Sequence, residues 1–234
     1  MSFISDNLTI VIPSKNEGKN IIPTLNSITN IYPDVKIVVA DTFTDNTANI
    51  IELYFQSIKH KNNLIIKGGL PAIGRNNGFN FVKTPYVLFM DADITIDDVN
   101  LEKILTTMMR DDLHLGTAKI TTKEFKYKII HYCFDIVQWV ISHKTPFAVG
   151  GFMLFNCEIF KGLGGFDNED KFAEDYHLSS KISPNKFKVF DYRPITTPRR
   201  YKNKGVFYMV KLMIKCWFNK YNDDFYKKDY NYWE

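Results

Sequence analysis

Short apolar runs alternate with amphipathic stretches in the first ninety residues of the chain. Short apolar runs of three to five residues between polar turns indicate strands that are buried on both faces. The stretches between them repeat their apolar residues at helical spacing. The predicted strands are 8–13, 35–40, 64–67 and 86–90, and the predicted helices are 20–31, 46–59 and 73–82. This alternation predicts an α/β fold with a parallel, doubly wound sheet and right-handed crossovers.

The second half of the chain is less regular. Its predicted helices are 99–109, 124–141 and 173–182, and its predicted strands are 114–122, 148–156 and 187–192. In the helix 124–141, one face carries Ile130, Phe134, Val137 and Ile141. Residues 204–221 form a further amphipathic, aromatic helix. We therefore expect one domain over residues 1–203, with halves 1–95 and 96–203, and a helical appendage over 204–234.

Composition narrows the classes of protein that the chain can represent. With 234 residues and 45% hydrophobic content, it can bury a sizeable core. It has no run of 18 apolar residues and starts with no basic, apolar leader, so we expect neither a simple transmembrane helix nor a signal peptide. Cys133, Cys157 and Cys216 show no zinc spacing, and we expect reduced, buried thiols in a cytoplasmic protein.

The net charge of +4 hides an uneven distribution. Residues 1–180 carry 17 basic and 21 acidic side chains, whereas residues 181–234 carry 13 basic and 5 acidic ones. A basic end indicates a polyanionic partner, such as a diphosphate or an anionic membrane surface. The acidic remainder argues against a nucleic-acid partner.

Two carboxylates end the most apolar of the predicted strands. Asp91 and Asp93 follow residues 86–90, where ligands of open α/β sheets bind. Side chains two residues apart point the same way if the extended backbone continues, and two such carboxylates repel unless a cation lies between them. Hard oxygen ligands suit Mg²⁺ or Mn²⁺. The alternative is a solvated strand end followed by a helix cap.

Further polar clusters follow the other strands, and together they carry a family resemblance. In chain order the motifs are Thr9 to Glu17, Ala40 to Thr47, Gly74 to Gly78, Leu88 to Asp93, Gly164 to Asp167 and Ala173 to Tyr176. The series resembles the inverting family 2 glycosyltransferases of GT-A fold, including the dolichol-phosphate mannose synthase-like group. The resemblance covers about residues 7–201. It implies a Rossmann-like nucleotide-binding half and a mostly parallel mixed sheet.

For the donor, the resemblance implies a nucleotide-sugar site. Its residues would be Pro13, Ser14, Glu17, Asp41, Arg75, Asp91, Ala92 and Gly151. Asp41 can accept a hydrogen bond from the N–H of a uracil or guanine ring, and the alternative is an Asx turn. Glu17 is otherwise a helix-terminal acid. Arg75 would sit against the nucleotide sugar, with Gly74 and Gly78 permitting close approach of the backbone to the ligand; the alternative is a surface arginine.

For catalysis, the resemblance implies one metal site and one base. Asp93 would bind Mn²⁺ or Mg²⁺ directly, and Asp91 would hold the ribose or reach the ion through water. Asp175 would take the proton of the acceptor hydroxyl, with Glu174 as a supporting neighbour. The alternative for this pair is two acids at a helix start.

The sequence allows more than one role for each of three other side chains. His177 is either a further metal ligand or, as we favour, a histidine on the helix surface. Trp139 and Trp217 are expected to be core or interface aromatics rather than platforms for sugar rings.

The basic, aromatic stretch 199–220 is too short and too charged to span a bilayer. It fits either an interfacial helix, which would give peripheral membrane contact, or a docked helix with solvated lysines. The expected acceptor is a glycan, a lipid-linked molecule or a protein. The competing functions are a nucleotidyltransferase, which would carry a glycine-rich basic loop after its first strand, and a catalytically silent nucleotide-sugar-binding protein.

Overall fold

The structure is a computed structural model that describes residues 2–228 and 230. Part of the predicted appendage, residues 229 and 231–234, therefore lies outside the described residues. The strands are β1 Leu8–Ser14, β2 Lys36–Asp41, β3 Asn63–Lys67, β4 Tyr86–Met90, β5 Ile94–Thr95, β6 Leu115–Ala118, β7 Phe152–Asn156, β8 Phe187–Phe190 and β9 Ile195–Thr196. The helices are α1 Phe3–Asn7, α2 Ile21–Thr29, α3 Thr47–Ser57, α4 Pro71–Phe79, α5 Leu101–Arg110, α6 Phe125–Ser142, α7 Cys157–Gly162, α8 Glu174–Ser179, α9 Arg199–Lys204, α10 Val206–Phe218 and α11 Asp223–Tyr226, with a 3-10 turn at Pro184–Lys186.

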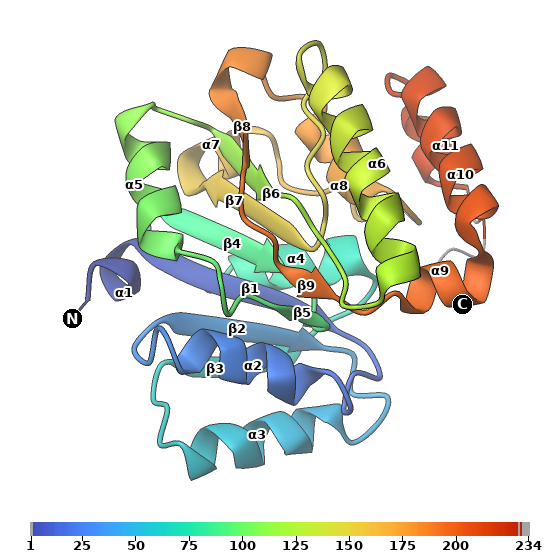
Figure 1. Cartoon of the computed structure of the whole chain (residues 1–234). Helices are drawn as coiled ribbons and strands as arrows, with labels where there is room; N and C mark the ends of the chain where they lie inside the picture. Colours follow the sequence, from blue (N-terminus) through green and yellow to red (C-terminus); the bar gives the residue numbers. More distant parts are fainter. Residues whose placement is uncertain (1, 229, 231–234) are drawn as a thin grey trace.

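Seven of these strands form one mixed sheet, shown across the centre of Figure 1. Its order is β3-β2-β1-β4-β7-β6-β8. The first four strands are parallel, β7 runs antiparallel to both neighbours, and β6 and β8 are parallel. The predicted parallel arrangement of the first half is thus confirmed, and the second half supplies the antiparallel strand. The short pair β5-β9 lies beyond the carboxyl end of β4.

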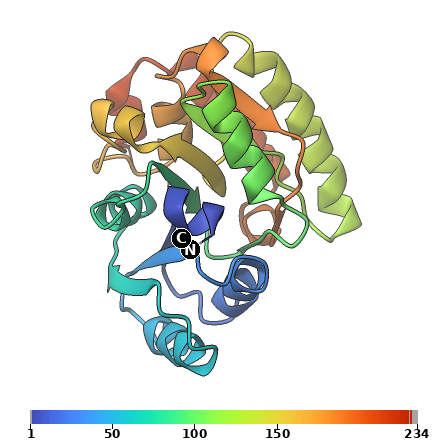
Figure 2. The same ribbon diagram turned by 90° about the vertical axis from the view of Figure 1, so that its left-hand side faces the viewer.

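Helices cover both faces of the sheet, as Figures 1 and 2 show. Alternate residues of β1 explain this arrangement, because successive side chains of a strand point to opposite faces. Ile10 and Ile12 pack in a cluster with α2 and α5, whereas Val11 belongs to a second cluster with α4 and α7. Burial on both faces accounts for the unbroken apolar runs of the sequence.

The two glycines of α4 serve the packing of this helix on the sheet. A Cβ at Gly78 would lie 2.3 Å from a methyl carbon of Val11, and one at Gly74 would lie 3.2 Å from Pro13. Both contacts are made with β1. The expectation that these glycines admit a ligand to the backbone was therefore wrong: they bring α4 close to the strand.

The helix predicted at 204–221 is present as α10, and the short helix α9 precedes it. Gly205 has φ +79°, a left-handed conformation that favours glycine, and it separates α9 from α10. A third cluster joins this part to α8 through Phe172, Tyr176, Leu212 and Cys216, among others. The division into a domain and an appendage stays a prediction.

Two smaller expectations were also wrong. The strand expected at 114–122 ends at Ala118. Cys133 is exposed, although all three cysteines are free thiols as expected. Of the two alternatives given for Trp139, its exposure of 64% excludes the core and leaves an interface aromatic as a prediction. Among the described residues, the longest and most apolar helices still fall short of what a bilayer span requires.

Candidate active site

A cavity of about 980 Å³ opens where β1 and β4 end. Eight of the residues singled out in the sequence line it: Pro13, Ser14, Glu17, Asp91, Ala92, Asp93, Gly151 and Asp175. A small hollow of about 50 Å³ is lined by Arg75 and Glu174, together with Asp91 and Asp175. Asp41 lines neither space. Residues from distant parts of the sequence therefore meet at the edge of the sheet where ligands of open α/β folds bind.

Asp175 is held in a fixed orientation at the start of α8. Its Oδ2 accepts a hydrogen bond from the Gly150 amide at 2.7 Å, and its Oδ1 accepts one from the Tyr176 amide at 2.8 Å. Burial, followed by the charge of Glu174, raises the pKa of Asp175 to about 6. A carboxyl group with a pKa near neutrality is suited to accept a proton at physiological pH.

Arg75 is a buried hub between the two halves of the site. It is 1% exposed, and its guanidinium donates to Glu174 Oε1 at 2.5 Å, to Asp91 Oδ1 at 2.7 Å and to the Gly150 carbonyl at 3.2 Å. The alternative of a surface arginine was therefore wrong. A guanidinium offers several donors in a rigid plane, so one side chain can position Asp91 and Glu174 together.

Asp93 lines the cavity and directly precedes β5 of the short β5-β9 pair. Its Oδ2 accepts a hydrogen bond from the Thr197 hydroxyl at 2.5 Å. Burial, and then the charge of Asp91, raises the pKa of the Asp93 carboxyl. A bound cation would offset both effects, so this pair of carboxylates fits a divalent metal.

The side chains around Asp93 limit the kind of metal site that can form there. Within residues 2–228 and 230, no three His, Cys, Asp or Glu side chains are arranged to hold one ion. Mg²⁺ commonly binds through one or two carboxylates together with substrate phosphates and water. The residues fit a site of that kind, shared with a diphosphate.

Glu17 contacts a segment far away in the sequence. Its carboxylate accepts hydrogen bonds from both terminal nitrogens of Arg199, at 2.5 and 3.2 Å, and from the Asn20 amide group at 2.7 Å. Arg199 begins α9, so this pair fastens the basic C-terminal part to the loop after β1. The sequence placed Arg199 in the basic stretch 199–220 but did not indicate this partner.

Asp41 adopts the predicted alternative, an Asx turn. Its Oδ1 accepts a hydrogen bond from the Phe43 amide at 2.7 Å. Its buried Oδ2 has no partner among the described residues, and neither does the hydroxyl of Ser14, which is its neighbour across β1 and β2. Buried polar atoms usually have hydrogen-bond partners. Two unpaired oxygen atoms at one edge of the sheet are therefore compatible with a bound ligand that supplies the missing partners.

His177 lies away from Asp93 and was wrongly expected on the helix surface. It is buried, its Nδ1 lies 2.7 Å from Asp170 Oδ2, and its Nε2 lies 3.1 Å from Asp223 Oδ1. Its ring also stacks on Tyr226 at 4.4 Å between centroids. His177 thus joins α8 to α11.

Comparisons with known proteins agree with this geometry. The family model for glycosyl transferase family 2 matches residues 9–164. The uncharacterized glycosyltransferase YibD of Escherichia coli (strain K12) is 28% identical over 114 residues, which are 48% of this chain and 33% of YibD. The poly-β-1,6-N-acetyl-D-glucosamine synthase of Staphylococcus epidermidis is 26% identical over 83% of this chain and 48% of its own length. The chain therefore spans half or less of these curated relatives.

Solved structures resemble the fold as a whole. The mannosyltransferase PcManGT of Pyrobaculum calidifontis, in complex with GDP-Man and Mn²⁺, is 18% identical with a TM-score of 0.67, over 89% of this chain and 64% of that one. TarS 1–349 of S. aureus, in complex with UDP-GlcNAc, is 20% identical with a TM-score of 0.60, over 82% and 59%.

Proposed function

The chain belongs to glycosyl transferase family 2 and has the GT-A fold. On this premise we propose that it is a metal-dependent, inverting glycosyltransferase with a nucleoside-diphosphate sugar as donor. The observation that carries the proposal is the convergence of Asp91, Asp93 and Asp175 on one cavity at the carboxyl edge of the parallel strands. Two structural neighbours are complexes with such donors, GDP-Man and UDP-GlcNAc, which supports this donor class.

The donor would lie over the ends of β1, β2 and β4. We expect the base to pair with the buried, unpaired oxygen atoms of Asp41 and Ser14 at the ends of β2 and β1, and Asp91 to bind the ribose. Asp93, with Asp91, would hold Mn²⁺ or Mg²⁺ against the diphosphate. Such an ion neutralises the negative charge that develops on the leaving nucleoside diphosphate.

Asp175 would act on the acceptor. Its carboxylate takes the proton of the acceptor hydroxyl while the hydroxyl oxygen bonds to the anomeric carbon. The bond from that carbon to the diphosphate oxygen breaks on the opposite face, which inverts the configuration. Arg75 positions this machinery, because it binds Asp91 on the donor side and Glu174 beside the base.

Two alternatives are less well supported. The loop after β1, from Ser14 to Gly18, is not the glycine-rich basic loop of a nucleotidyltransferase. A silent binding protein would have no need of a carboxyl that lines the ligand cavity, is fixed by two backbone amides and has a raised pKa.

The proposal is tested by donor hydrolysis without acceptor, across UDP- and GDP-sugars in the presence of Mn²⁺. One donor is expected to be hydrolysed slowly, with water in place of the acceptor. EDTA is expected to abolish this activity, and excess Mn²⁺ to restore it, because Asp91, Asp93 and the diphosphate repel one another without a cation. Activity that survives complete chelation would contradict the metal assignment.

A further inference from the structure

The cavity of the active site does not end at the catalytic residues. The same space, about 980 Å³ in all, continues between α6 and α10. Its walls there are apolar: Phe134, Val137 and Ile141 of α6, and Leu212, Met213 and Trp217 of α10. We call this part the α6–α10 groove. Figure 1 shows the two helices side by side at one end of the molecule.

Exposed apolar residues continue the groove to the surface of both helices. On α6 they recur at helical spacing, at Phe125, Ile129, Tyr132, Ile136 and Val140. On α10 they are Phe207 together with Val210, Ile214 and Phe218, and the last three also line the cavity. Phe207 is 92% exposed and Phe218 is 79% exposed. Contiguous exposed apolar patches on a protein mark an interaction surface, so the groove has a rim that favours an apolar environment.

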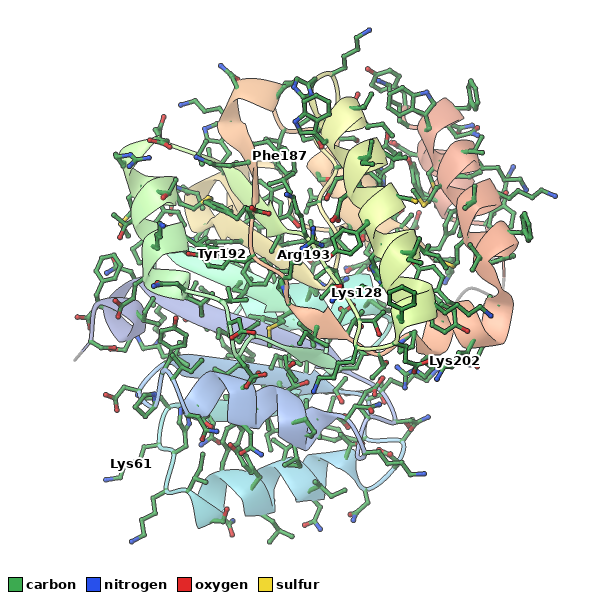
Figure 3. The ribbon with its side chains drawn as sticks, viewed as in Figure 1. Lys61, Lys128, Phe187, Tyr192, Arg193 and Lys202 are labelled. Atoms are coloured by element: carbon green, nitrogen blue, oxygen red, sulfur yellow. The ribbon has the colours of Figure 1, made fainter. Side chains whose placement is uncertain are left out.

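The charge of this end of the molecule is strongly positive. Helices α6, α9 and α10 contain eight Lys and Arg residues and one acidic residue, Asp135. Asp135 is 9% exposed and pairs with Arg193 at 2.8 Å. Figure 3 labels Lys128 of α6 and Lys202 of α9 near the N-terminal end of α6. Lys202 also forms an ion pair with Glu124, which directly precedes α6. An apolar surface with a basic surround fits the head-group region of an anionic membrane.

On the premise of the proposed function, we propose that the acceptor is a membrane lipid whose hydrocarbon chain lies in the α6–α10 groove while its polar head reaches Asp175. The hydroxyls of a long glycan would find few partners between these apolar walls, and burying unpaired polar groups is costly. A lipid satisfies the apolar walls, the apolar rim and the basic surround together.

The test is the binding of n-alkyl phosphates of increasing chain length, below their micelle concentrations, measured by titration calorimetry. Burying each added methylene is expected to raise affinity by up to about fourfold until the groove is full. Val137→Trp, which fills the groove from its wall, is expected to remove most of this dependence. The matched control is Leu53→Trp on α3, at a side chain that is 57% exposed on another part of the molecule; it should keep the wild-type dependence.

Affinity that does not change with chain length, in the wild-type chain, would overturn the proposal regardless of how the variants fold. An unchanged dependence in Val137→Trp would also overturn it. Donor hydrolysis, measured separately on the wild-type chain, separates this inference from the proposed function. Donor hydrolysis without any effect of alkyl-chain length on affinity would contradict only the proposal that the groove holds a lipid. An effect of alkyl-chain length without hydrolysis of any donor would contradict only the proposed function.

Discussion

Asp175→Asn is expected to lower the rate of sugar transfer by about 10² to 10⁴-fold, the usual effect of losing a general base. Nucleotide affinity should change little, because Asp175 belongs to the acceptor side of the proposed site. The amide keeps the shape of the side chain but cannot take the acceptor proton. The control is Asp98→Asn, which removes the same charge from an exposed position. Equal turnover in Asp175→Asn and wild type would move the base elsewhere, and Glu174 would be tested next.

The same carboxyl sets the expected pH dependence. Burial and the charge of Glu174 raise the pKa of Asp175 to about 6. Because the ionised carboxylate is the base, the rate of sugar transfer should be at its maximum when the pH is above this pKa. The rate should fall as the pH drops through the pKa. The residual activity of Asp175→Asn should lack this step.

Arg75→Met is expected to destabilise the fold by about 3 to 5 kcal/mol, the usual cost of removing one partner of a buried ion pair. The loss leaves Glu174, whose side chain is 5% exposed, without its cation and next to Asp175. Urea denaturation followed by circular dichroism measures the change. Arg75→Met/Glu174→Gln should recover part of the stability, because the second substitution removes the uncompensated charge.

The control for this prediction is Arg110→Met. Arg110 pairs with Asp111 at 2.7 Å, but its side chain is 69% exposed. Solvent screens exposed pairs, so the unfolding midpoint should be close to that of the wild type. An Arg75→Met chain as stable as the Arg110→Met chain would contradict the role of Arg75 as a buried hub.

The sequence predicted the parallel first half of the sheet because the signals for its strands and helices are local. Apolar runs such as residues 86–90 have no polar face, so they indicate buried strands without any knowledge of their partners. The carboxyl ends of those strands then bring Ser14, Asp41 and Asp91 to one edge by topology alone. Asp93 and Asp175 line the active-site cavity at this edge, and they were identified by their motifs.

The remaining features depend on contacts between distant residues, which periodicity does not encode. Arg75 meets Glu174 across 99 positions, and Arg199 meets Glu17 across 182. Gly78 was misinterpreted because a glycine in a helix indicates close approach but not what approaches it. The residues Phe134, Val137 and Ile141 were placed correctly on one face of α6, but the same pattern fits a core and the wall of a cavity.

The most direct test of the account is calorimetric titration of the wild-type chain with UDP and with GDP, in Mn²⁺ and in EDTA. We predict that one nucleoside diphosphate binds in Mn²⁺, and that chelation lowers its affinity by about tenfold or more, which requires the loss of only about 1.4 kcal/mol of attraction. Binding of neither nucleotide, or equal affinity in EDTA, would contradict the claim that Asp91 and Asp93 form a metal-dependent nucleotide-sugar site.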